Sequence, residues 1–381
     1  MSACKHRKGK AAAGRLLAAA LLALWTFVQS PMAGAGEVPA IIGINRLHLA
    51  WLPVRDQERV LKEIAASGVT HVRLSLSRPV HKSIEALEIA DRLGLRILLE
   101  IQLANKSYYP ESTRPRPGFG RIWDIHRLSD LDLDRYRKSL REALQRIDGL
   151  GIRLDAVEPG NEINYSAYNG DLLVYRKPGR RTPRRVSDVA NRAAFERGLD
   201  AYIGAVRISR EEVRATVHSR DAAIISAGLS DVSSEEADKR GMERLDPGEV
   251  ISLLRQRGID NHVDAYGIHV YPGRKSTAAI GTDVTALLDF CRPEDAGRPC
   301  WVTEWGIANT ARSCPIDDRG RESAIRAMRE VFRKLIAAER LTAAFYYDWD
   351  TQPSYSLWRC GELSSAGAAA IEPDIDGAPA R

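Results

Sequence analysis

The sequence predicts a single (β/α)8 barrel, because short apolar segments rich in β-branched residues alternate with amphipathic helical segments along nearly its whole length. Strict alternation indicates parallel strands joined by right-handed helical crossovers, and eight strand–helix pairs fit a closed barrel better than an open sheet. The predicted strands are Ile41–Asn45, Thr70–Ser77, Arg96–Leu103, Leu154–Val157, Ala222–Leu229, Val263–Val270, Trp301–Trp305 and Leu341–Tyr347.

The segments between the predicted strands show the apolar spacing of helices. Leu133, Tyr136 and Leu140 recur at intervals of three and four, which places them on one helical face. Asp246 and Pro247 begin another helix, with a capping side chain at the N-cap and proline at the first helical position. We therefore expect each connector to pack one apolar face against the sheet.

The first 35 residues have the composition of a secretory signal peptide. Five basic residues and no acid precede the apolar segment Leu16–Val28, and small residues around Ala35 follow it. The apolar segment has 13 residues, whereas a membrane-spanning helix needs about 20. We therefore predict a signal peptide at residues 1–35, a mature domain at residues 36–381 and no stable membrane insertion after cleavage. The basic residues are Lys5, Arg7, Lys8, Lys10 and Arg15.

The charge balance gives little support to nucleic-acid binding. The formal net charge of the whole chain is +6, and removal of the five basic residues of the predicted signal peptide leaves +1. A nearly neutral domain lacks the strongly basic surface that binds phosphate backbones. We expect a monomer that is secreted or periplasmic.

The four cysteines of the predicted mature domain indicate two disulfides, since their number is even and an exported protein meets oxidising conditions. Cys291 and Cys300 fall at the bottom of a barrel, before and at the start of the seventh strand, whereas Cys314 and Cys360 follow strands seven and eight at the top. A disulfide requires Cα atoms within about 7 Å, which excludes a top-to-bottom bridge. The predicted pairs are Cys291–Cys300 and Cys314–Cys360, and free buried thiols are the alternative.

Two glutamates each close one of the predicted strands. Glu162 lies in Pro-Gly-Asn-Glu-Ile-Asn after the fourth strand, and Glu304 lies in Trp-Val-Thr-Glu-Trp-Gly at the end of the seventh. The C-terminal ends of barrel strands form the face that carries active sites in this fold. Retaining hydrolysis of a glycoside needs one carboxyl to protonate the leaving oxygen and a second to attack the anomeric carbon. The alternative is two unrelated structural glutamates, although charged side chains seldom end apolar strands without a reason.

These motifs resemble those of the clan A glycoside hydrolases, over essentially the whole mature chain. The run Glu158-Pro-Gly-Asn-Glu162 is similar to the Glu-x-x-Asn-Glu run of family thirty-nine, and Thr303-Glu304-Trp305-Gly306 also occurs in family five cellulase-like enzymes. Ile163 stands where the commonest pattern has proline. The resemblance implies a retaining O-glycosidase that cleaves a β-linked glycan by double displacement, with no metal and no organic cofactor.

By this resemblance Glu162 is the acid/base and Glu304 is the nucleophile, and Asn161 is expected to hydrogen-bond the sugar 2-hydroxyl. The acid must keep its proton near neutral pH, which a crowded pocket favours, and the nucleophile must stay ionised, which nearby donors favour. We expect the two carboxyls to lie about 5 to 5.5 Å apart, as retention requires. Glu158 is expected to pair inside the barrel and to have no catalytic role.

Four further residues complete the expected site. Arg73 on the second strand matches the clan's arginine that supports the nucleophile, and His269 and Tyr271 match its His-x-Tyr, whose tyrosine is a second donor to Glu304. Trp349, after the eighth strand, is expected to be the stacking platform for the sugar in the cleaved subsite. The structural alternatives are a strand-end ion pair for Arg73, a core histidine for His269 and an ordinary loop aromatic for Trp349.

Two predicted loops on the same face interleave aromatic residues with arginines. Together they favour an acidic poly- or oligosaccharide substrate, because rings stack on sugar faces and guanidinium groups bind carboxylates. A solvated arginine loop is the alternative interpretation. The residues are Tyr108, Tyr109, Arg114, Arg116, Arg121 and Trp123 after the third strand, and Tyr165, Tyr168, Tyr175, Arg176, Lys177, Arg180, Arg181, Arg184 and Arg185 after the fourth.

Other chemistries fit the sequence less well. The scattered histidines form no metal-ligand pattern, and the Gly-x-Ser-x-Gly motif of serine hydrolases is absent from the sequence. A transglycosylase would use the same residues as a hydrolase. A non-catalytic polysaccharide-binding barrel is the alternative outside enzymes, but it has no need of buried ionised groups that cost free energy to desolvate.

Overall fold

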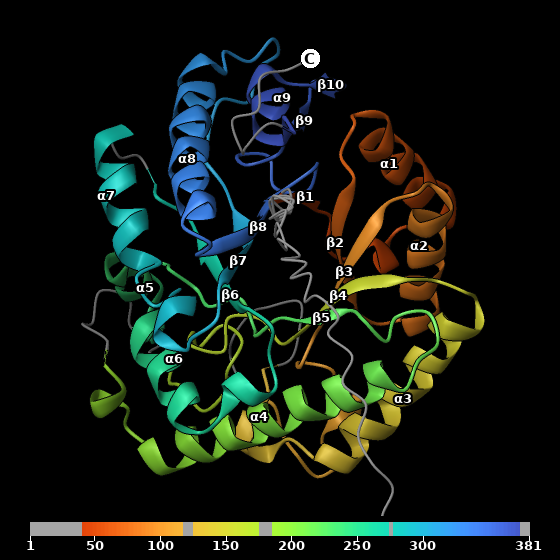
Figure 1. Ribbon diagram of the computed structural model, residues 1–381, viewed down its shortest axis with the longest axis vertical. Coiled ribbons are helices and arrows are strands. Elements are labelled where there is room, and N and C mark those ends of the chain that lie inside the picture. The colour runs from red at the N-terminus through yellow and green to blue at the C-terminus, as the bar shows by residue number, and fades with distance from the viewer. Residues whose placement is uncertain (1–39, 117–124, 175–184, 274–276, 374–381) are drawn as a thin grey trace, which may run out of the picture. The chain divides into compact units, whose positions relative to one another are not determined.

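The computed structural model describes residues 40–116, 125–174, 185–273 and 277–373, so the predicted signal peptide lies outside the described residues (Figure 1). Eight strands form one sheet in the order β5-β4-β3-β2-β1-β8-β7-β6, and all the neighbouring pairs are parallel. The first and eighth strands are neighbours, as a closed barrel requires. The strands are β1 Ile41–Asn45, β2 His71–Leu76, β3 Arg96–Ile101, β4 Leu154–Pro159, β5 Ala223–Ile224, β6 Tyr266–Val270, β7 Cys300–Trp305 and β8 Leu341–Tyr346.

The barrel closes between β5 and β6 through single bridges rather than a continuous ladder. Two isolated parallel bridges join the chain just after β5 to the segment around β6. Ser226 interrupts the regular pairing, because its hydroxyl oxygen accepts the hydrogen bond of the Gly267 amide at 3.0 Å. The predicted strand Ala222–Leu229 is therefore a two-residue ladder followed by bridges. The predicted (β/α)8 barrel is confirmed.

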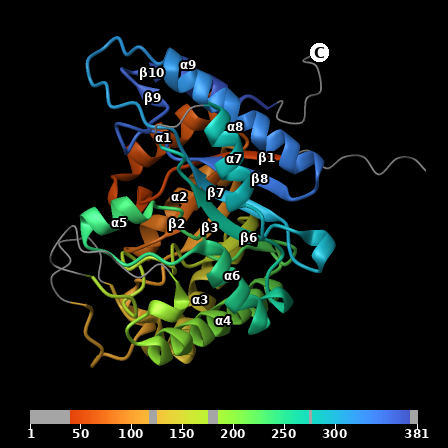
Figure 2. The ribbon, with the colours of Figure 1, turned by 90° about the vertical axis from the view of Figure 1, so that its left-hand side faces the viewer.

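Helices follow the strands along the chain, and Figure 1 shows α1 to α8 placed around the sheet. The predicted cap at Asp246 is confirmed, since its side chain accepts a hydrogen bond from the Glu249 amide at 3.1 Å. After β8 the chain forms the hairpin β9–β10 and the helix α9, which lies beside α8 (Figure 2). The bounds are α1 Val54–Ala66, α2 Val80–Arg92, α3 Leu133–Gly149, α4 Arg192–Arg214, α5 Ser234–Arg240, α6 Pro247–Gln256, α7 Thr277–Leu287, α8 Arg319–Ala337, β9 Trp358–Arg359, β10 Glu362–Leu363 and α9 Ser365–Ile371.

Both predicted disulfides are present. Cys291–Cys300 joins the end of the α7 region to the first residue of β7, at the bottom of the barrel. Cys314–Cys360 joins the segment between β7 and α8 to the turn of the β9–β10 hairpin, at the opposite end. Among the described residues, no helix combines the length and the apolar character needed to cross a membrane.

The lower interior of the barrel is filled by apolar side chains that alternate with outward-facing ones along the strands. Gly43 on β1 leaves the space that Phe345 on β8 occupies, because a Cβ atom at Gly43 would lie 2.4 Å from the phenyl ring. Above this layer the inward positions become polar. The apolar cluster consists of Leu98, Ala156, Ile225, Ala265, Trp301, Ala343 and Phe345.

We predict that Gly43→Ala destabilises the domain by about 1 to 3 kcal/mol, because the added methyl group forces the Phe345 ring out of its packed position. Chemical denaturation measures the free energy of unfolding. Gly149→Ala at the end of α3 is the matched control, since a Cβ atom there meets nothing within 4 Å. Equal stability of the two variants would contradict this account of the barrel interior.

Candidate active site

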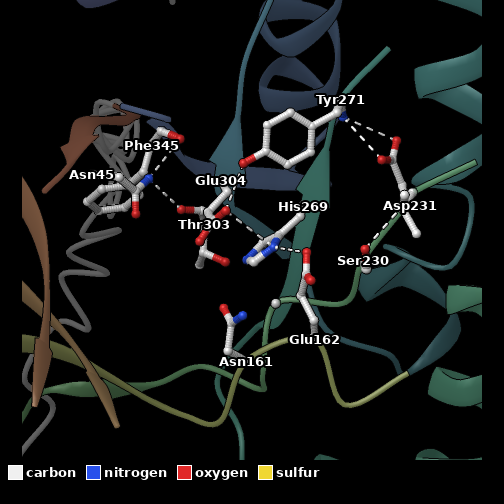
Figure 3. A network of polar contacts seen from close by, with 12 residues as sticks. Asn45, Asn161, Glu162, Ser230, Asp231, His269, Tyr271, Thr303, Glu304 and Phe345 are labelled. Carbon is white, nitrogen blue, oxygen red and sulfur yellow. Dashed lines mark hydrogen bonds and ion pairs between the residues drawn. The ribbon is translucent and has the colours of Figure 1, made fainter. Parts of the chain in front are cut away.

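The polar residues above the apolar layer converge at the C-terminal ends of the strands (Figure 3). Arg73 from β2 is fully buried at their centre. Its Nη1 donates to Glu304 Oε1 at 2.6 Å, and its Nε donates to Glu158 Oε2 at 2.6 Å. Asn45 and Asn161 accept further hydrogen bonds from the guanidinium at 3.0 and 3.2 Å. Arg73 is therefore in direct contact with Glu304, as the role expected for it requires.

Glu158 at the end of β4 hydrogen-bonds residues from β2, from β7 and from the segment after β5. It is fully buried, and besides Arg73 it accepts hydrogen bonds from the Thr303 hydroxyl at 2.8 Å and the Gly228 amide at 2.9 Å. The expected internal pairing of Glu158 is confirmed. Both of its carboxylate oxygens accept hydrogen bonds from residues that hold the barrel strands together.

Glu304 at the end of β7 lies among donors. Besides Arg73, the Tyr271 hydroxyl donates to Oε2 at 2.7 Å, and His269 Nδ1 lies 3.5 Å from the same oxygen. Burial would raise the pKa of the Glu304 carboxyl, but His269, Arg73 and Tyr271 together outweigh burial and hold the pKa below its usual value. The site therefore keeps this carboxylate ionised.

Glu162 is held in a different way. Its Oε1 lies 3.0 Å from His269 Nδ1, and 12% of its side chain is exposed. Its backbone has φ of 43°, in the left-handed region that side chains other than glycine rarely adopt. The Glu162 amide donates to the Gly228 carbonyl at 2.9 Å, which fixes the turn after β4. Such strain at a strand end is typical of functional positions.

His269 on β6 places the two glutamates next to each other. Its Nδ1 contacts Glu162 Oε1 at 3.0 Å and Glu304 Oε2 at 3.5 Å, so these oxygens are at most about 6.5 Å apart. Burial alone would lower the pKa of His269, but Glu304 and Glu162 raise it above the ordinary histidine value. The sequence placed His269 on the same face as Tyr271 but gave no sign of its contact with Glu162. The expected separation of about 5 to 5.5 Å stays a prediction.

Asp231, which the sequence analysis did not identify, positions Tyr271. Both carboxylate oxygens accept from the Tyr271 amide, at 3.2 and 3.3 Å. Burial raises the pKa of Asp231 to about 6. No motif marks Asp231, because it lies in an irregular segment after β5 and acts through a backbone contact.

Trp349 cannot be a sugar platform, so that prediction is wrong. The side chain is fully buried and stacks on Trp358, with ring centroids 5.5 Å apart, which leaves no open face. Tyr347 lies at the barrel mouth instead and lines both the cavity that contains Glu162 and the cavity that contains Glu304. The alternation of side chains along β8 could have identified Tyr347 in the sequence. Phe345 points into the barrel, so residue 347, two positions later, is expected on the same side.

Two adjacent cavities flank the glutamates and share Tyr347 and Gln352 in their walls. The larger, of about 770 Å³, contains Glu162 and Tyr271, and the smaller, of about 300 Å³, contains Glu304 and Asn161. Both volumes suit organic ligands. In the described part of the chain, no group of three or more histidine, cysteine or acidic side chains is arranged to hold a metal ion.

The two aromatic and arginine loops are only partly described. Tyr108 and Tyr109 are buried, Tyr108 against Tyr136 and Tyr109 against His126, so the expected stacking of these rings on sugars is wrong. Tyr165 and Tyr168 line the larger and the smaller cavity respectively. Arg114, Arg116 and Arg185 are described, whereas Arg121, Trp123, Tyr175, Arg176, Lys177, Arg180, Arg181 and Arg184 lie outside the described residues.

The sequence matches no protein-family model, and a search of curated proteins finds no match. Similar solved structures include a fungal β-1,4-galactanase, with 14% identity, a TM-score of 0.56, and coverage of 87% of this chain and 99% of the matched chain. An exo-β-1,4-mannosidase from Opitutaceae bacterium strain TAV5 has 13% identity, a TM-score of 0.54 and coverage of 87% and 58%. Virulence factor SghA from Agrobacterium tumefaciens has 12% identity, a TM-score of 0.53 and coverage of 88% and 98%. These likenesses show a shared barrel fold.

We predict that Tyr271→Phe raises the pKa of Glu304, because the 2.7 Å hydrogen bond to its carboxylate is lost. If activity needs ionised Glu304, the acidic limb of the pH profile of kcat/KM moves to higher pH by about one unit. Profiles measured on an aryl β-glycoside test this shift. Tyr355→Phe, whose ring lies 5.5 Å from that of Tyr271, should leave the acidic limb in place. Shifts of the same size in both variants would contradict the role given to the Tyr271 hydroxyl.

The disulfide Cys314–Cys360 supports the segment after β8 that carries Gln352 and Tyr355 into the cavity wall. We predict that replacing both cysteines by serine lowers kcat/KM by roughly tenfold through misplaced side chains. Replacing Cys291 and Cys300 at the other end of the barrel is the control, and should lower the melting temperature with little change in kcat/KM. A greater kinetic effect of the control pair would refute the assignment.

Proposed function

We propose that this protein is a retaining O-glycoside hydrolase that cleaves a β-linked glycan, with Glu162 as acid/base and Glu304 as nucleophile. The observation that supports it most is the asymmetric pair of carboxylates at the barrel mouth. Glu304 accepts from both Arg73 and Tyr271, whereas Glu162 contacts His269 from the other side. Two carboxyl groups in unlike surroundings are what acid/base and nucleophilic roles require.

In the first step Glu304 attacks the anomeric carbon, the glycosidic bond breaks, and Glu162 gives its proton to the leaving oxygen. Glu162 then becomes negative beside His269, whose raised pKa favours the imidazolium form that stabilises this charge. In the second step Glu162 removes a proton from water, the resulting oxygen attacks the anomeric carbon, and Glu304 leaves as a carboxylate. Arg73 and Tyr271 lower the energy of Glu304 as a leaving group.

Asn161 is suited to bind the sugar attached to Glu304. Its Oδ1 accepts from Arg73 at 3.2 Å, which leaves Nδ2 as its donor, and the residue lines the smaller cavity. A hydrogen bond from Nδ2 to the sugar 2-hydroxyl would strengthen as the transition state develops. Tyr347 supplies an aromatic wall at the junction of the two cavities, where the cleaved bond would lie.

The proteins with similar folds include a β-1,4-galactanase and an exo-β-1,4-mannosidase, and both of these act on β-linked glycans. Transglycosylation by the same residues differs only in whether a sugar or water resolves the intermediate. A non-catalytic binding barrel is disfavoured, because burial of Arg73 with Glu158 and Glu304 costs desolvation energy that binding alone does not need. The two disulfides favour export to an oxidising compartment, and the monomeric state stays a prediction.

The two glutamates should respond differently to removal. Glu304→Ala should abolish turnover of every substrate, since no covalent intermediate can form. Glu162→Ala should keep cleaving activated aryl glycosides, whose leaving groups need little protonation, and should be accelerated by added azide. Release of the aryl group, with and without azide, measures both effects.

Glu142→Ala on the exposed face of α3 serves as the surface control and should retain full activity. Equal loss in both active-site variants on an activated glycoside, without azide rescue, would overturn the assigned roles. Release of reducing ends from β-glucans, β-mannans, xylans, galactans and uronic-acid polymers then identifies the sugar.

A further inference from the structure

A third cavity lies apart from the glutamates, in the connection between β3 and α3. It has a volume of about 570 Å³, within the range of ligand pockets. Arg114, Arg116 and Arg127 line it together with the hydroxyl residues Ser112 and Thr113. None of the residues named as walls of the two catalytic cavities belongs to it.

Arginines outnumber acids among the described lining residues of this cavity, three to one. No ion pair involving Arg114, Arg116 or Arg127 occurs among the described residues, and Asp130 is the one acidic residue in the described lining. Burial and then the neighbouring charge of Arg127 lower the pKa of Arg116, and the opposing effects of Glu243 and Asp171 only partly offset them. Guanidinium groups that repel one another in this way are stabilised when an anion binds between them.

Arg116 is held in place before any ligand binds. Its Nη2 donates to the Gly170 carbonyl at 2.7 Å, and its backbone amide donates to the Ile125 carbonyl at 2.8 Å. Gly170 itself is held against the backbone of His126, where a Cβ atom would lie 2.7 Å from the His126 carbonyl, so the acceptor of the Arg116 hydrogen bond is also fixed in place. A fixed guanidinium loses little entropy on binding, which favours affinity.

The segment after β4 that contains Gly170 also contributes to the wall of the smaller catalytic cavity. Gly170, which Arg116 contacts, is two residues from Tyr168, and Tyr168 lines the smaller cavity that contains Glu304. The contact of Arg116 and the wall of the smaller cavity therefore belong to the same short segment after β4.

We propose that the cavity lined by Arg114, Arg116 and Arg127 is a secondary binding site for the carboxylates of uronic-acid residues in a glycan chain. The proposal deepens the proposed function by naming an acidic class of substrate, and rests on it only for the assumption that the ligand is a glycan. Carboxylates fit guanidinium groups in bidentate geometry, and the hydroxyls of Ser112 and Thr113 can bind sugar oxygens. Inorganic phosphate shares the anionic chemistry and is therefore a necessary competitor in the test.

Binding is measured by calorimetry with short β-linked oligomannuronates and with the same oligomers after carboxyl reduction, which are neutral. The mature protein should bind the charged oligomers at low salt and the neutral ones more weakly. Arg114→Gln combined with Arg127→Gln should weaken binding of the charged oligomers by about tenfold and flatten its dependence on salt. Both side chains belong to exposed residues, so these changes remove charge without opening the core.

Arg153→Gln combined with Arg220→Gln is the matched control, because it removes the same charge from exposed residues before β4 and β5, at the bottom of the barrel. This variant should bind the charged oligomers like the unmodified protein. Equal weakening in both double variants, equal affinity for neutral oligomers, or absence of binding would overturn the proposal. Displacement of the oligomer by equimolar inorganic phosphate would assign the cavity to a free anion and would also overturn it. Because the readout is binding, a protein that binds oligouronates through these arginines but cleaves no β-glycoside would contradict the proposed hydrolysis alone.

Discussion

The buried guanidinium of Arg73 is the interaction on which the remainder of the site depends. It bridges Glu158, which is structural, and Glu304, which faces the cavity, at 2.6 Å each. A third carboxyl, Glu100, is also fully buried, and burial raises its pKa to about 8, so it is mostly protonated at neutral pH. With His269 as imidazolium, two cations then face the two carboxylates Glu158 and Glu304. The cluster is therefore neutral when Glu162 holds its proton, which is the form that an acid catalyst needs.

The buried contacts of Arg73 and Glu158 contribute to the stability of the barrel and also position the two glutamates of the site. Removing one member of a buried ion pair typically costs about 3 to 5 kcal/mol, because the partner charge is left without compensation. Glu158 also binds the Gly228 amide, and the Gly228 carbonyl accepts from the Glu162 amide, so the turn that carries Glu162 is fastened to the charged cluster. The strained backbone of Glu162 is held by these contacts rather than by its own conformational preference.

The periodic features of the chain could be predicted from its sequence, whereas contacts made by irregular segments could not. Alternating strands and helices indicated the barrel, and the barrel in turn placed both glutamates on one face and selected the disulfide pairs. The structure brings Arg73, Tyr271 and Glu304 together as expected. The prediction for Trp349 was wrong because the chain turns after the end of β8 and the indole packs against Trp358. Burial of such loop aromatics depends on distant packing partners, which the local sequence does not show.

The charges around the smaller cavity complement those of the arginine site. Of its described charged lining residues, Arg46 lies 2.6 Å from Asp350, and Glu304 is paired with Arg73. Burial lowers the pKa of His48, a third residue of this wall, to about 4, so its imidazole is neutral at pH 7. An anionic sugar at the cleaved position would therefore meet the negative Glu304 with no uncompensated cation among the described lining residues. The arginine cavity, by contrast, has three arginines and one acid, Asp130, among its described lining residues. Under the proposed function, this division favours a chain whose cleaved residue is neutral and whose acidic groups lie farther along.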